Sequence, residues 1–389
     1  MFWKAVWARR ALIMAGPLSV WVASLGCPKN RVDTEKLLGS LGVPIRFAAT
    51  PGRARLVLIN SCAFIEPATR ESLRTIFDTA KLIGGLKRRP RLVVAGCLPG
   101  RYGTGTLASQ IPEVDLWLDS ASIEDWPRQL GRFLGIDAEP APGRLCVSKS
   151  YAWLKISEGC QHRCSFCAIP SIRGPLRSLA PEIILEEAEK LLADDVRELI
   201  LVAQDLTAWG RDLISAGSAA GPADLAELVD ALAGLAKLKW LRLMYLYPAA
   251  VSDKLLKVMA QGAPVLPYLD LPFQHSEARV LASMGRPFQA DPREIVAKIR
   301  HALPGASLRA TLMVGFPGES EQDFQALCDF VAETRFQNLG VFPFYAEEGV
   351  PAASLPGQIP EHVKQERCRR IMELQAEISA DLLAGRVGE

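Results

Sequence analysis

The stretch SEGCQHRCSFCAIPSIRG, residues 157–174, places Cys160, Cys164 and Cys167 within eight positions. It begins at the end of a short apolar segment, 151–157, whose pattern predicts a buried strand. Each of the four irons in a cubane iron–sulfur cluster needs a ligand. Three cysteines therefore leave one iron open to a small molecule that carries adjacent amino and carboxylate groups. The alternative is a zinc site, which normally takes four protein ligands and here would need an outside ligand such as His162.

Strand and helix patterns alternate on the carboxyl-terminal side of this loop. The predicted strands are 151–157, 198–205, 240–248, 268–275, 307–317 and 338–345. Helical patterns separate them, and this alternation predicts a parallel sheet with helices on its faces. Six such units are fewer than the eight of a closed barrel. We therefore expect an open, partial (β/α)6 barrel, with its site at the carboxyl ends of the strands. Ser320 and Asp323 form an approximate capping box for one of its helices.

The same alternation occupies the first 145 residues, and three cysteines recur in it. Predicted strands at 19–24, 54–60 and 91–96, separated by helical segments, indicate an α/β fold with a doubly wound parallel sheet. Cys27, Cys62 and Cys97 each stand just past one of these strands, 35 residues apart. Because the carboxyl ends of parallel strands lie along one edge of a sheet, the three thiols are expected to converge there. The alternative is that each is a core residue, since free cysteine is a common small apolar filler.

The composition of the 389-residue chain limits its class. The formal net charge of +2 gives no indication of a chain wrapped in nucleic acid. The nine cysteines are odd in number and partly clustered, which favours metal sites in a reducing cytoplasm over disulfides. Residues 1–17 imitate a signal peptide but lead straight into the first strand, so we interpret them as an extension. No later segment is long and apolar enough to span a membrane.

The spacing Cys-x-x-x-Cys-x-x-Cys after the first strand of a βα barrel resembles that of the radical S-adenosylmethionine enzymes. With a preceding domain that carries three spaced cysteines, the chain resembles the methylthiotransferases within that group. One branch of this family modifies an adenosine of transfer RNA beside the anticodon. The other modifies an aspartate of ribosomal protein twelve of the small subunit. The stretches SLGCPKNRVDTEKLLG (24–39), YLDLPFQHSEARVLASMGR (268–286) and GFPGE (315–319) resemble the ribosomal-protein branch.

Two positions distinguish this chain from the transfer RNA branch. That branch usually has a Gln-Met-Asn-like stretch after the first cysteine, where this chain has Pro28, Lys29 and Asn30. It also tends to have a lysine and an aromatic residue where this chain has His162 and Arg163. The transfer RNA methylthiotransferase nevertheless stays open as an alternative. A non-catalytic, zinc-dependent nucleic-acid-binding module is the alternative from another class.

The resemblance implies two 4Fe–4S clusters and S-adenosylmethionine as cofactors. The catalytic cluster, whose open iron binds S-adenosylmethionine, would be held by Cys160, Cys164 and Cys167, and the second cluster by Cys27, Cys62 and Cys97. The implied reaction is methylthiolation of the β-carbon of the aspartate, with S-adenosylmethionine as radical source and methyl donor. The implied enzyme is cytoplasmic and monomeric, has no membrane partner, and takes electrons from a donor such as flavodoxin or ferredoxin.

The resemblance also sets the expected domain bounds. We expect an extension at 1–17, the N-terminal methylthiotransferase domain at 18–135, a Pro- and Gly-rich linker at 136–150, and the barrel with a C-terminal helix at 151–389. The family normally continues into a small TRAM β-barrel. This sequence stops at AGRVGE, about where that barrel would begin, so the TRAM domain is expected to be absent.

Five further residues are candidates for binding S-adenosylmethionine. Phe166 matches the aromatic position near the adenine, and Gln204 and Asp205 end the strand that usually places groups for the methionyl amine. Arg309 is a candidate partner of the methionyl carboxylate, and His275 is a candidate lining residue of the cavity. Each has a structural alternative: Asp205 as a helix cap, Arg309 in a salt bridge, and His275 as a hydrogen-bonded structural histidine.

Overall fold

The computed structural model describes residues 16–136, 141–215, 221–286, 288 and 290–388. Contacts between Cα atoms divide the chain into two units. The N-terminal unit comprises Met1–Val147 together with Ser171–Gly174, and the barrel unit comprises Ser148–Pro170 together with Pro175–Glu389. The sequence did not predict that Ser171–Gly174 belongs with the N-terminal unit. The predicted extension up to residue 15, and residues 137–140 of the predicted linker, lie outside the described residues.

A five-stranded sheet forms the centre of the N-terminal unit, in the order β2-β1-β3-β4-β5. All neighbouring strands in it are parallel. The strands are β1 (Leu18–Ser24), β2 (Ile45–Phe47), β3 (Leu56–Ser61), β4 (Arg91–Gly96) and β5 (Leu116–Asp119). The central strand β3 is buried at every position, as expected for a parallel sheet covered on both faces. The doubly wound parallel sheet is thus confirmed, whereas the short edge strands β2 and β5 were not predicted.

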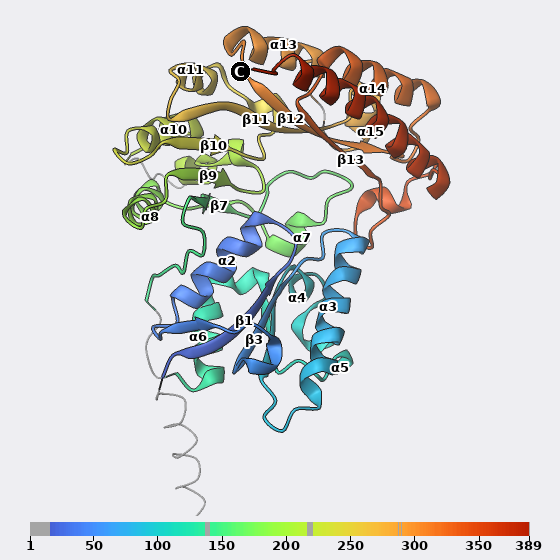
Figure 1. The fold of residues 1–389 in the computed structure, drawn as a ribbon. Coiled ribbons are helices and arrows are strands. Elements are labelled where there is room, and N and C mark those ends of the chain that lie inside the picture. Colours follow the sequence, from blue (N-terminus) through green and yellow to red (C-terminus); the bar gives the residue numbers. More distant parts are fainter. Residues whose placement is uncertain (1–15, 137–140, 216–220, 287, 289, 389) are drawn as a thin grey trace, which may run out of the picture. The chain divides into compact units, whose positions relative to one another are not determined.

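Helices cover both faces of this sheet. They are α2 (Pro28–Gly39), α3 (Glu66–Gly84), α4 (Cys97–Tyr102), α5 (Thr104–Gln110) and α6 (Trp126–Leu134). Leu37 of α2 and Trp126 of α6 belong to one apolar core with β1 and β3. Figure 1 shows α3 and α5 on the opposite side of the sheet from α6. The two helical layers therefore leave the ends of the strands as the places where a site can open.

The buried face of α3 differs from the expected one, since Leu73 is only half-buried and Phe77 is exposed. The helical spacing of Leu73, Ile76, Phe77 and Ala80 predicts that they share a face. Ile76 and Ala80 are buried, but Phe77 is 47% exposed. The buried face of α3 continues from Ile76 to Ile83, and Phe77 lies one residue, about 100° of helical rotation, beyond it.

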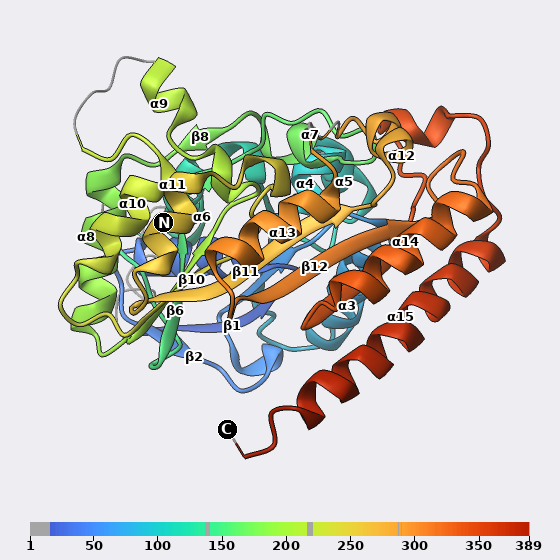
Figure 2. The same cartoon turned by 90° about the horizontal axis from the view of Figure 1, so that it is seen from above.

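A six-stranded sheet forms the centre of the barrel unit, in the order β13-β12-β11-β10-β9-β6. Its strands are β6 (Tyr151–Lys155), β9 (Glu198–Val202), β10 (Trp240–Leu243), β11 (Val265–Gln274), β12 (Ser307–Val314) and β13 (Asn338–Pro343). All neighbouring pairs are parallel. Figure 2 shows β10, β11 and β12 of this sheet side by side. The edge strands β6 and β13 do not pair with each other, so the sheet is open. This confirms the partial (β/α)6 barrel. A short antiparallel pair, β7 (Ser157–Glu158) and β8 (Arg177–Ser178), flanks the cysteine loop.

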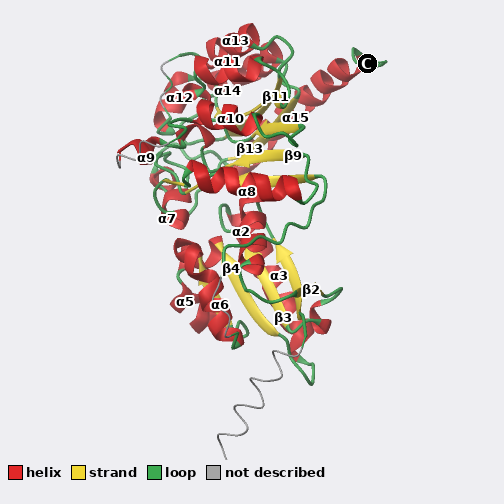
Figure 3. Ribbon diagram, turned by 90° about the vertical axis from the view of Figure 1, so that its left-hand side faces the viewer, coloured by secondary structure: helices red, strands yellow, loops and turns green. Residues whose placement is uncertain are grey.

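Helices follow the strands of this sheet, and Figure 3 shows them in red beside the yellow strands. They are α8 (Pro181–Ala193), α9 (Arg211–Ser215), α10 (Leu225–Ala233), α11 (Asp253–Ala260), α12 (Ala278–Ser283), α13 (Pro292–Ala302), α14 (Glu321–Thr334) and α15 (Glu361–Ala384). The short helix α7 (Ile169–Arg173) precedes them, and its residues from Ser171 on belong to the N-terminal unit. The predicted capping box is present, because the side chains of Ser320 and Asp323 each accept a hydrogen bond from the other's backbone N–H. Within the described residues, none of the helices has the length and apolar character needed to cross a membrane.

Candidate functional site

Three thiols of the N-terminal unit gather at the carboxyl ends of adjacent strands. Cys27 follows β1 at the start of α2, Cys62 follows β3, and Cys97 follows β4 as the first residue of α4. The Oδ1 atom of Asn30 lies 3.9 Å from the Sγ of Cys27 and 4.0 Å from the Sγ of Cys97. Both of these thiols act electrostatically on Cys62. The structure therefore brings together the three cysteines that the sequence places 35 residues apart. We call them the N-terminal triad.

Gly26 makes the close approach within this triad possible. Its φ of +79° lies in the left-handed region, which residues with a side chain rarely adopt. A Cβ atom at this position would lie 2.6 Å from the Cβ and 2.8 Å from the Sγ of Cys62. Because no side chain fits in that space, a glycine before Cys27 is required for Cys27 and Cys62 to lie side by side.

A buried arginine supplies positive charge to the N-terminal triad. Arg173 is 2% exposed and donates hydrogen bonds to Asp33 Oδ2 over 2.9 Å and to Asn30 Oδ1 over 2.5 Å. Its Nη2 also lies 3.4 Å from the Sγ of Cys97 as a donor. Asn30 in turn donates from Nδ2 to the carbonyl oxygens of Leu25 and Ser61. α2 therefore presents Asn30 and Asp33 toward the triad and holds Arg173 there.

The second group of thiols lies in the loop after β7. Burial raises the pKa of Cys167 to about 12, and Cys164 and Cys160 raise it further by electrostatic interaction. The pKa of Cys160 is also raised by burial, against a hydrogen bond from the backbone N–H of His162. Cys164 is buried and accepts a hydrogen bond from Nη1 of Arg286 over 3.6 Å. The structure thus gathers these three thiols, which we call the barrel triad.

A stack of side chains fixes this loop to the strand ends of the barrel. The guanidinium of Arg286 lies 4.4 Å from the ring centroid of Tyr247. Tyr247 stacks on His162 with a centroid separation of 4.3 Å and an interplanar angle of 15°. His162 Nε2 lies 2.7 Å from Asp205 Oδ2, and Arg286 Nη2 donates to the carbonyl oxygen of Pro272 over 2.8 Å. Because these residues follow β9, β10 and β11, the stack joins the barrel triad to three strands.

The predicted residues of the S-adenosylmethionine site fall around the barrel triad in different ways. Phe166 packs against a buried apolar cluster that includes Met284 and Phe316. Gln204 donates from Nε2 to Glu158 over 2.6 Å, and its buried Oε1 has no hydrogen-bond partner within the described residues. Asp205 bonds His162 and also accepts from the backbone N–H of Thr207, which is the capping role given as its alternative. The binding roles of all three stay predictions.

Arg309 and His275 lie on the neighbouring strands β12 and β11 or directly after them, and they differ in exposure. Arg309 stands near the start of β12, opposite Asp270 of β11, with 3.6 Å between Nε and Oδ1. This is the salt bridge given as the alternative for Arg309, which is 48% exposed. His275 is fully buried, and its Nδ1 accepts a hydrogen bond from the backbone N–H of Glu277. That contact matches the structural alternative for His275. The ligand roles of both residues remain predictions.

Sequence reasoning missed the charged and aromatic partners of the thiols. Arg173, Arg286, Asn30 and Tyr247 were not among the candidates, although the first three stand in the stretches quoted for the resemblance. The sequence did contain a signal for the two arginines. Arg173 in PSIRG and Arg286 in SMGR both stand outside the apolar pattern of the predicted helices, within motifs that were quoted for the resemblance. The partner of each arginine could not be predicted, because Arg173 and Cys97 are 76 residues apart and Arg286 and Cys164 are 122 apart.

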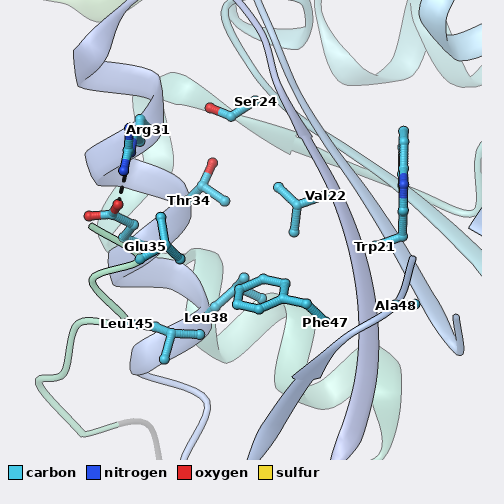
Figure 4. A pocket seen from close by; sticks show the side chains of 11 residues that line it. Trp21, Val22, Ser24, Arg31, Thr34, Glu35, Leu38, Phe47, Ala48 and Leu145 are labelled. Carbon is cyan, nitrogen blue, oxygen red and sulfur yellow. Dashed lines mark hydrogen bonds and ion pairs between the residues drawn. The ribbon is translucent and has the colours of Figure 1, made fainter. Parts of the chain in front are cut away.

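A separate cavity of about 350 Å³ opens in the N-terminal unit and is lined by neither triad. Figure 4 shows Val22 of β1 facing Leu38 of α2 across it, with the Arg31–Glu35 ion pair at its edge. Its wall is mainly apolar. None of the six candidate cysteines is among its lining residues, so the cavity is distinct from the thiol sites.

The two triads fit iron–sulfur clusters by their donor chemistry. Burial raises the pKa of Cys62 to about 11 and that of Cys167 to about 12, so these thiols ionise only where positive charge is brought to them. Iron would bring that charge, and each of these thiolates would hold one iron of a cubane cluster. Within the described residues, no three His, Cys, Asp or Glu side chains are placed to hold a single metal ion. Thiols that bind different irons have no need to meet at one point.

The two units, each with a parallel sheet and three gathered cysteines, match two known families. The Radical SAM superfamily model matches residues 154–331, and the model of Uncharacterized protein family UPF0004 matches residues 19–119. A structure of the radical S-adenosylmethionine methyltransferase TsrM from Kitasatospora setae aligns with a TM-score of 0.58 at 12% identity, over 84% of this chain and 75% of that one. That likeness supports the fold alone. The chain is a radical S-adenosylmethionine enzyme, a class whose cofactors are S-adenosylmethionine and 4Fe–4S clusters.

Full-length relatives define the family more narrowly. The ribosomal protein uS12 methylthiotransferase RimO of Nitratidesulfovibrio vulgaris (strain DP4) is 53% identical over 94% of this chain and 84% of the relative. The proteins of the same name from Oleidesulfovibrio alaskensis and Pelotomaculum thermopropionicum are 50% and 42% identical, over 95% and 96% of this chain. The chain belongs to the RimO family of methylthiotransferases. The recognition made from the cysteine motifs is therefore confirmed.

Proposed function

We propose that this enzyme transfers a methylthio group to the β-carbon of an aspartate in ribosomal protein uS12, free or within the small subunit. The observation that carries the proposal is the presence of two separate thiol triads, one at the carboxyl ends of adjacent parallel strands and the other in a single loop after β7. Membership of the RimO family supports the choice of substrate. The near-neutral charge of +2 also supports a protein substrate, because a transfer RNA binder must neutralise several phosphates with basic side chains.

Each triad has a proposed resident group. Cys27, Cys62 and Cys97 would hold one 4Fe–4S cluster, and Cys160, Cys164 and Cys167 the other. When bound, the two clusters and S-adenosylmethionine supply the one-electron cleavage of the sulfonium and the sulfur and methyl groups that are transferred.

The chain's own residues hold and orient these groups. Arg286 donates to Cys164 and lies on Tyr247, so it fixes the loop while its charge offsets that of the thiolates. Glu158 ties the end of β7 to Lys155 over 2.8 Å and to Gln204 over 2.6 Å. These contacts orient Gln204, whose free Oε1 is a candidate acceptor for the methionyl amine. We further propose that Phe166 lies at the adenine and that Asp205 joins Gln204 in binding the methionyl amine. In the same proposal Arg309 pairs with the methionyl carboxylate and His275 lines the cavity.

The cellular setting follows from the same proposal. Buried free thiols and a redox cofactor fit a reducing cytoplasm. We propose a monomer that receives electrons from a small carrier such as flavodoxin or ferredoxin.

The test presents two substrates to the same anaerobically reconstituted enzyme. With dithionite as reductant, S-adenosylmethionine and sulfide, we expect a mass gain equal to one methylthio group on intact uS12 and on a peptide that spans its target aspartate. An unmodified anticodon stem-loop at the same concentration should gain no mass. The same gain on the RNA, with none on the protein or peptide, would exclude the proposal in favour of the transfer RNA activity.

A control variant separates the two triads. With Cys27, Cys62 and Cys97 replaced by Ala, the enzyme should still cleave S-adenosylmethionine to 5′-deoxyadenosine but should form no methylthio product. About four of roughly eight irons should remain, because each triad is assigned one cubane. An unchanged iron content, or continued product formation, would show that the N-terminal triad is structural.

A further inference from the structure

The contact between Arg173 and Cys97 links the N-terminal triad to an arginine that is distant in sequence. Arg173 stands six residues after Cys167, yet Ser171–Gly174 belongs by its contacts to the N-terminal unit. Within that unit its guanidinium is 2% exposed and reaches three acceptors: Asp33, Asn30 and the Sγ of Cys97. A positive charge without access to water therefore lies against one of the three thiols.

This arrangement goes beyond what a structural ion pair requires. The side chain of Asp33 is 0% exposed and accepts a hydrogen bond from Nη1 of Arg173 over 2.9 Å, which satisfies one side of the guanidinium. Nη2 is directed elsewhere, toward Asn30 Oδ1 and the Sγ of Cys97 at 3.4 Å. A second ion pair also involves a carboxylate of α2: Arg144 binds the buried Glu35 over 2.7 Å, and its Nε and Nη2 both donate to Oε2.

Hydrogen bonds and positive charge at a sulfur ligand change the redox behaviour of an iron–sulfur cluster. Reduction adds one electron to the cluster, and part of the added negative charge is carried by the thiolate sulfurs. A donor with a full positive charge, held in a water-excluded site, favours the reduced form more than it would in water. Donors of this kind around the ligands are among the protein's main means of tuning a metal site.

We propose that Arg173 is a positioning residue that raises the reduction potential of the cluster held by Cys27, Cys62 and Cys97. The proposal rests on the assignment of that cluster in the proposed function. Arg173 would act on the cluster through its contact with the Sγ of Cys97. By making the N-terminal cluster easier to reduce, it sets how far that cluster is reduced by the same electron donor that serves the barrel triad.

The experiment isolates the N-terminal cluster in the full-length chain. Cys160, Cys164 and Cys167 are replaced by Ala, the protein is reconstituted anaerobically, and the cluster is titrated with dithionite while its EPR signal is followed. Asp33→Asn is compared with Arg173→Met/Asp33→Asn, so that no buried carboxylate is left unpaired. Glu35→Gln is compared with Arg144→Met/Glu35→Gln, which is the matched removal of a second arginine that pairs with a buried carboxylate of α2.

We expect loss of Arg173 to lower the ratio of reduced to oxidised cluster at least tenfold at a fixed potential, which corresponds to about 59 mV for one electron. Loss of Arg144 should change that ratio less than threefold. Arg173→Lys keeps the positive charge but not the two-pronged guanidinium group. It should therefore lower the reduction potential of the cluster by less than Arg173→Met does. If Arg173→Met/Asp33→Asn holds four irons and titrates within threefold of Asp33→Asn, the proposal is wrong.

Two other outcomes are also decisive. If the variant without Arg173 loses its iron while Asp33→Asn keeps it, Arg173→Lys is titrated instead. A reduction potential lower than that of the protein that retains Arg173 then supports the proposal, and an unchanged reduction potential overturns it. If the protein that lacks Cys160, Cys164 and Cys167 binds no iron at all, the N-terminal triad does not hold a cluster. That result contradicts the proposed function itself, and it is distinct from a failure of the proposal for Arg173.

Discussion

Nε2 of His275 lies 3.8 Å from Oε2 of Glu319, and both side chains are fully buried. Burial lowers the pKa of His275 to about 4. Burial also raises the pKa of Glu319 to about 7, although Arg367 and the backbone N–H groups of Phe316 and Gly315 lower it in part. Because Nδ1 of His275 accepts a hydrogen bond from Glu277, the neutral ring carries its proton on Nε2, facing the carboxyl group. The pair is thus held largely uncharged in mildly acid solution.

The two groups give the stability of the enzyme opposite dependences on pH. The pKa of His275 is lower in the folded state, so its contribution to stability rises with pH from about 4 to 6.5. The pKa of Glu319 is higher in the folded state, so its contribution falls as pH rises from 4.5 to about 7. A shift of roughly two pKa units corresponds to about 3 kcal/mol. Over their shared range the two contributions therefore largely cancel.

Removing either group should leave the pH dependence of stability that the other group causes. Between pH 5 and pH 6.5, we expect the melting temperature of Glu319→Gln to rise relative to the unsubstituted enzyme, and that of His275→Gln to fall. The measurement is the difference in melting temperature at each pH, which removes any constant cost of the substitution. Differences that do not vary with pH, or that vary in the same direction for both variants, would contradict the pKa directions.

Gly285 should be essential for the shape of the barrel triad. Its φ is +68°, and a Cβ atom there would lie 2.8 Å from the carbonyl oxygen of Arg163 and 3.4 Å from the Cα of Cys164. Gly285→Ala therefore combines about 1 kcal/mol of backbone strain with displacement of the cysteine loop. We expect loss of iron to a chelator to accelerate several-fold, measured in a background that retains only the barrel triad.

Gly262→Ala is the matched control for that substitution. Gly262 has a φ of +87° and no neighbouring atom within 4 Å of the added Cβ. It should therefore suffer the backbone strain alone and lose iron at the unsubstituted rate. Equal rates of iron loss in the two alanine variants would show that the contact of Gly285 with the loop is unimportant.

Tyr247 should act through its ring and not through its hydroxyl group. The ring lies between His162 and the guanidinium of Arg286, and a partly desolvated cation–π contact contributes about 1–2 kcal/mol. We expect Tyr247→Leu to lower the melting temperature and to speed iron loss from the barrel triad. Tyr247→Phe, which keeps the ring, should match the unsubstituted enzyme in both measurements. An equal effect of the two substitutions would instead assign the role to the hydroxyl.

Asn30 should be required as an amide. Its Nδ2 donates to the carbonyl oxygens of Leu25 and Ser61, and its Oδ1 accepts from Arg173. Asn30→Asp keeps the acceptor but turns a carboxylate oxygen toward two carbonyls, and each unsatisfied buried group costs about 1–3 kcal/mol.

We expect a drop in melting temperature of several degrees for Asn30→Asp, read from thermal unfolding followed by circular dichroism. The same change at the exposed Asn338 should alter the melting temperature by less than about 1 °C, since surface substitutions are usually within about 0.5 kcal/mol. A similar drop at both positions would point to a general effect of added negative charge.

Much of the fold could be predicted because it is encoded locally. The strand β4 was predicted with its bounds, and the capping box at Ser320 was visible as a short motif. The convergence of Cys27, Cys62 and Cys97 followed from one rule, that parallel strands end along the same edge. In contrast, β2 and β5 are only three and four residues long, too short for the alternation of apolar and polar residues to be detected.

The chemical partners of the thiols could not be predicted for a different reason. Arg173 and Asp33 are 140 residues apart in sequence, and nothing in the local pattern around either one indicates the other. Asp205 illustrates the opposite limit. Its two alternatives were not exclusive, since one carboxylate caps Thr207 and also contacts His162. Local patterns therefore identified the thiol ligands, while the groups that orient and neutralise them depend on tertiary packing.

The membership of Ser171–Gly174 in the N-terminal unit has a consequence for how such enzymes can be recombined. A gene fragment that ends at Val147 would encode all three N-terminal thiols but not Arg173, and would leave the buried carboxylate of Asp33 without its cation. A chimera that joins the N-terminal half of one relative to the barrel of another would receive this arginine from the barrel's gene segment. The two gene segments therefore cannot be exchanged independently. A chimera keeps these contacts only if the residues at 171–174 from one relative fit the residues at positions 30 and 33 from the other.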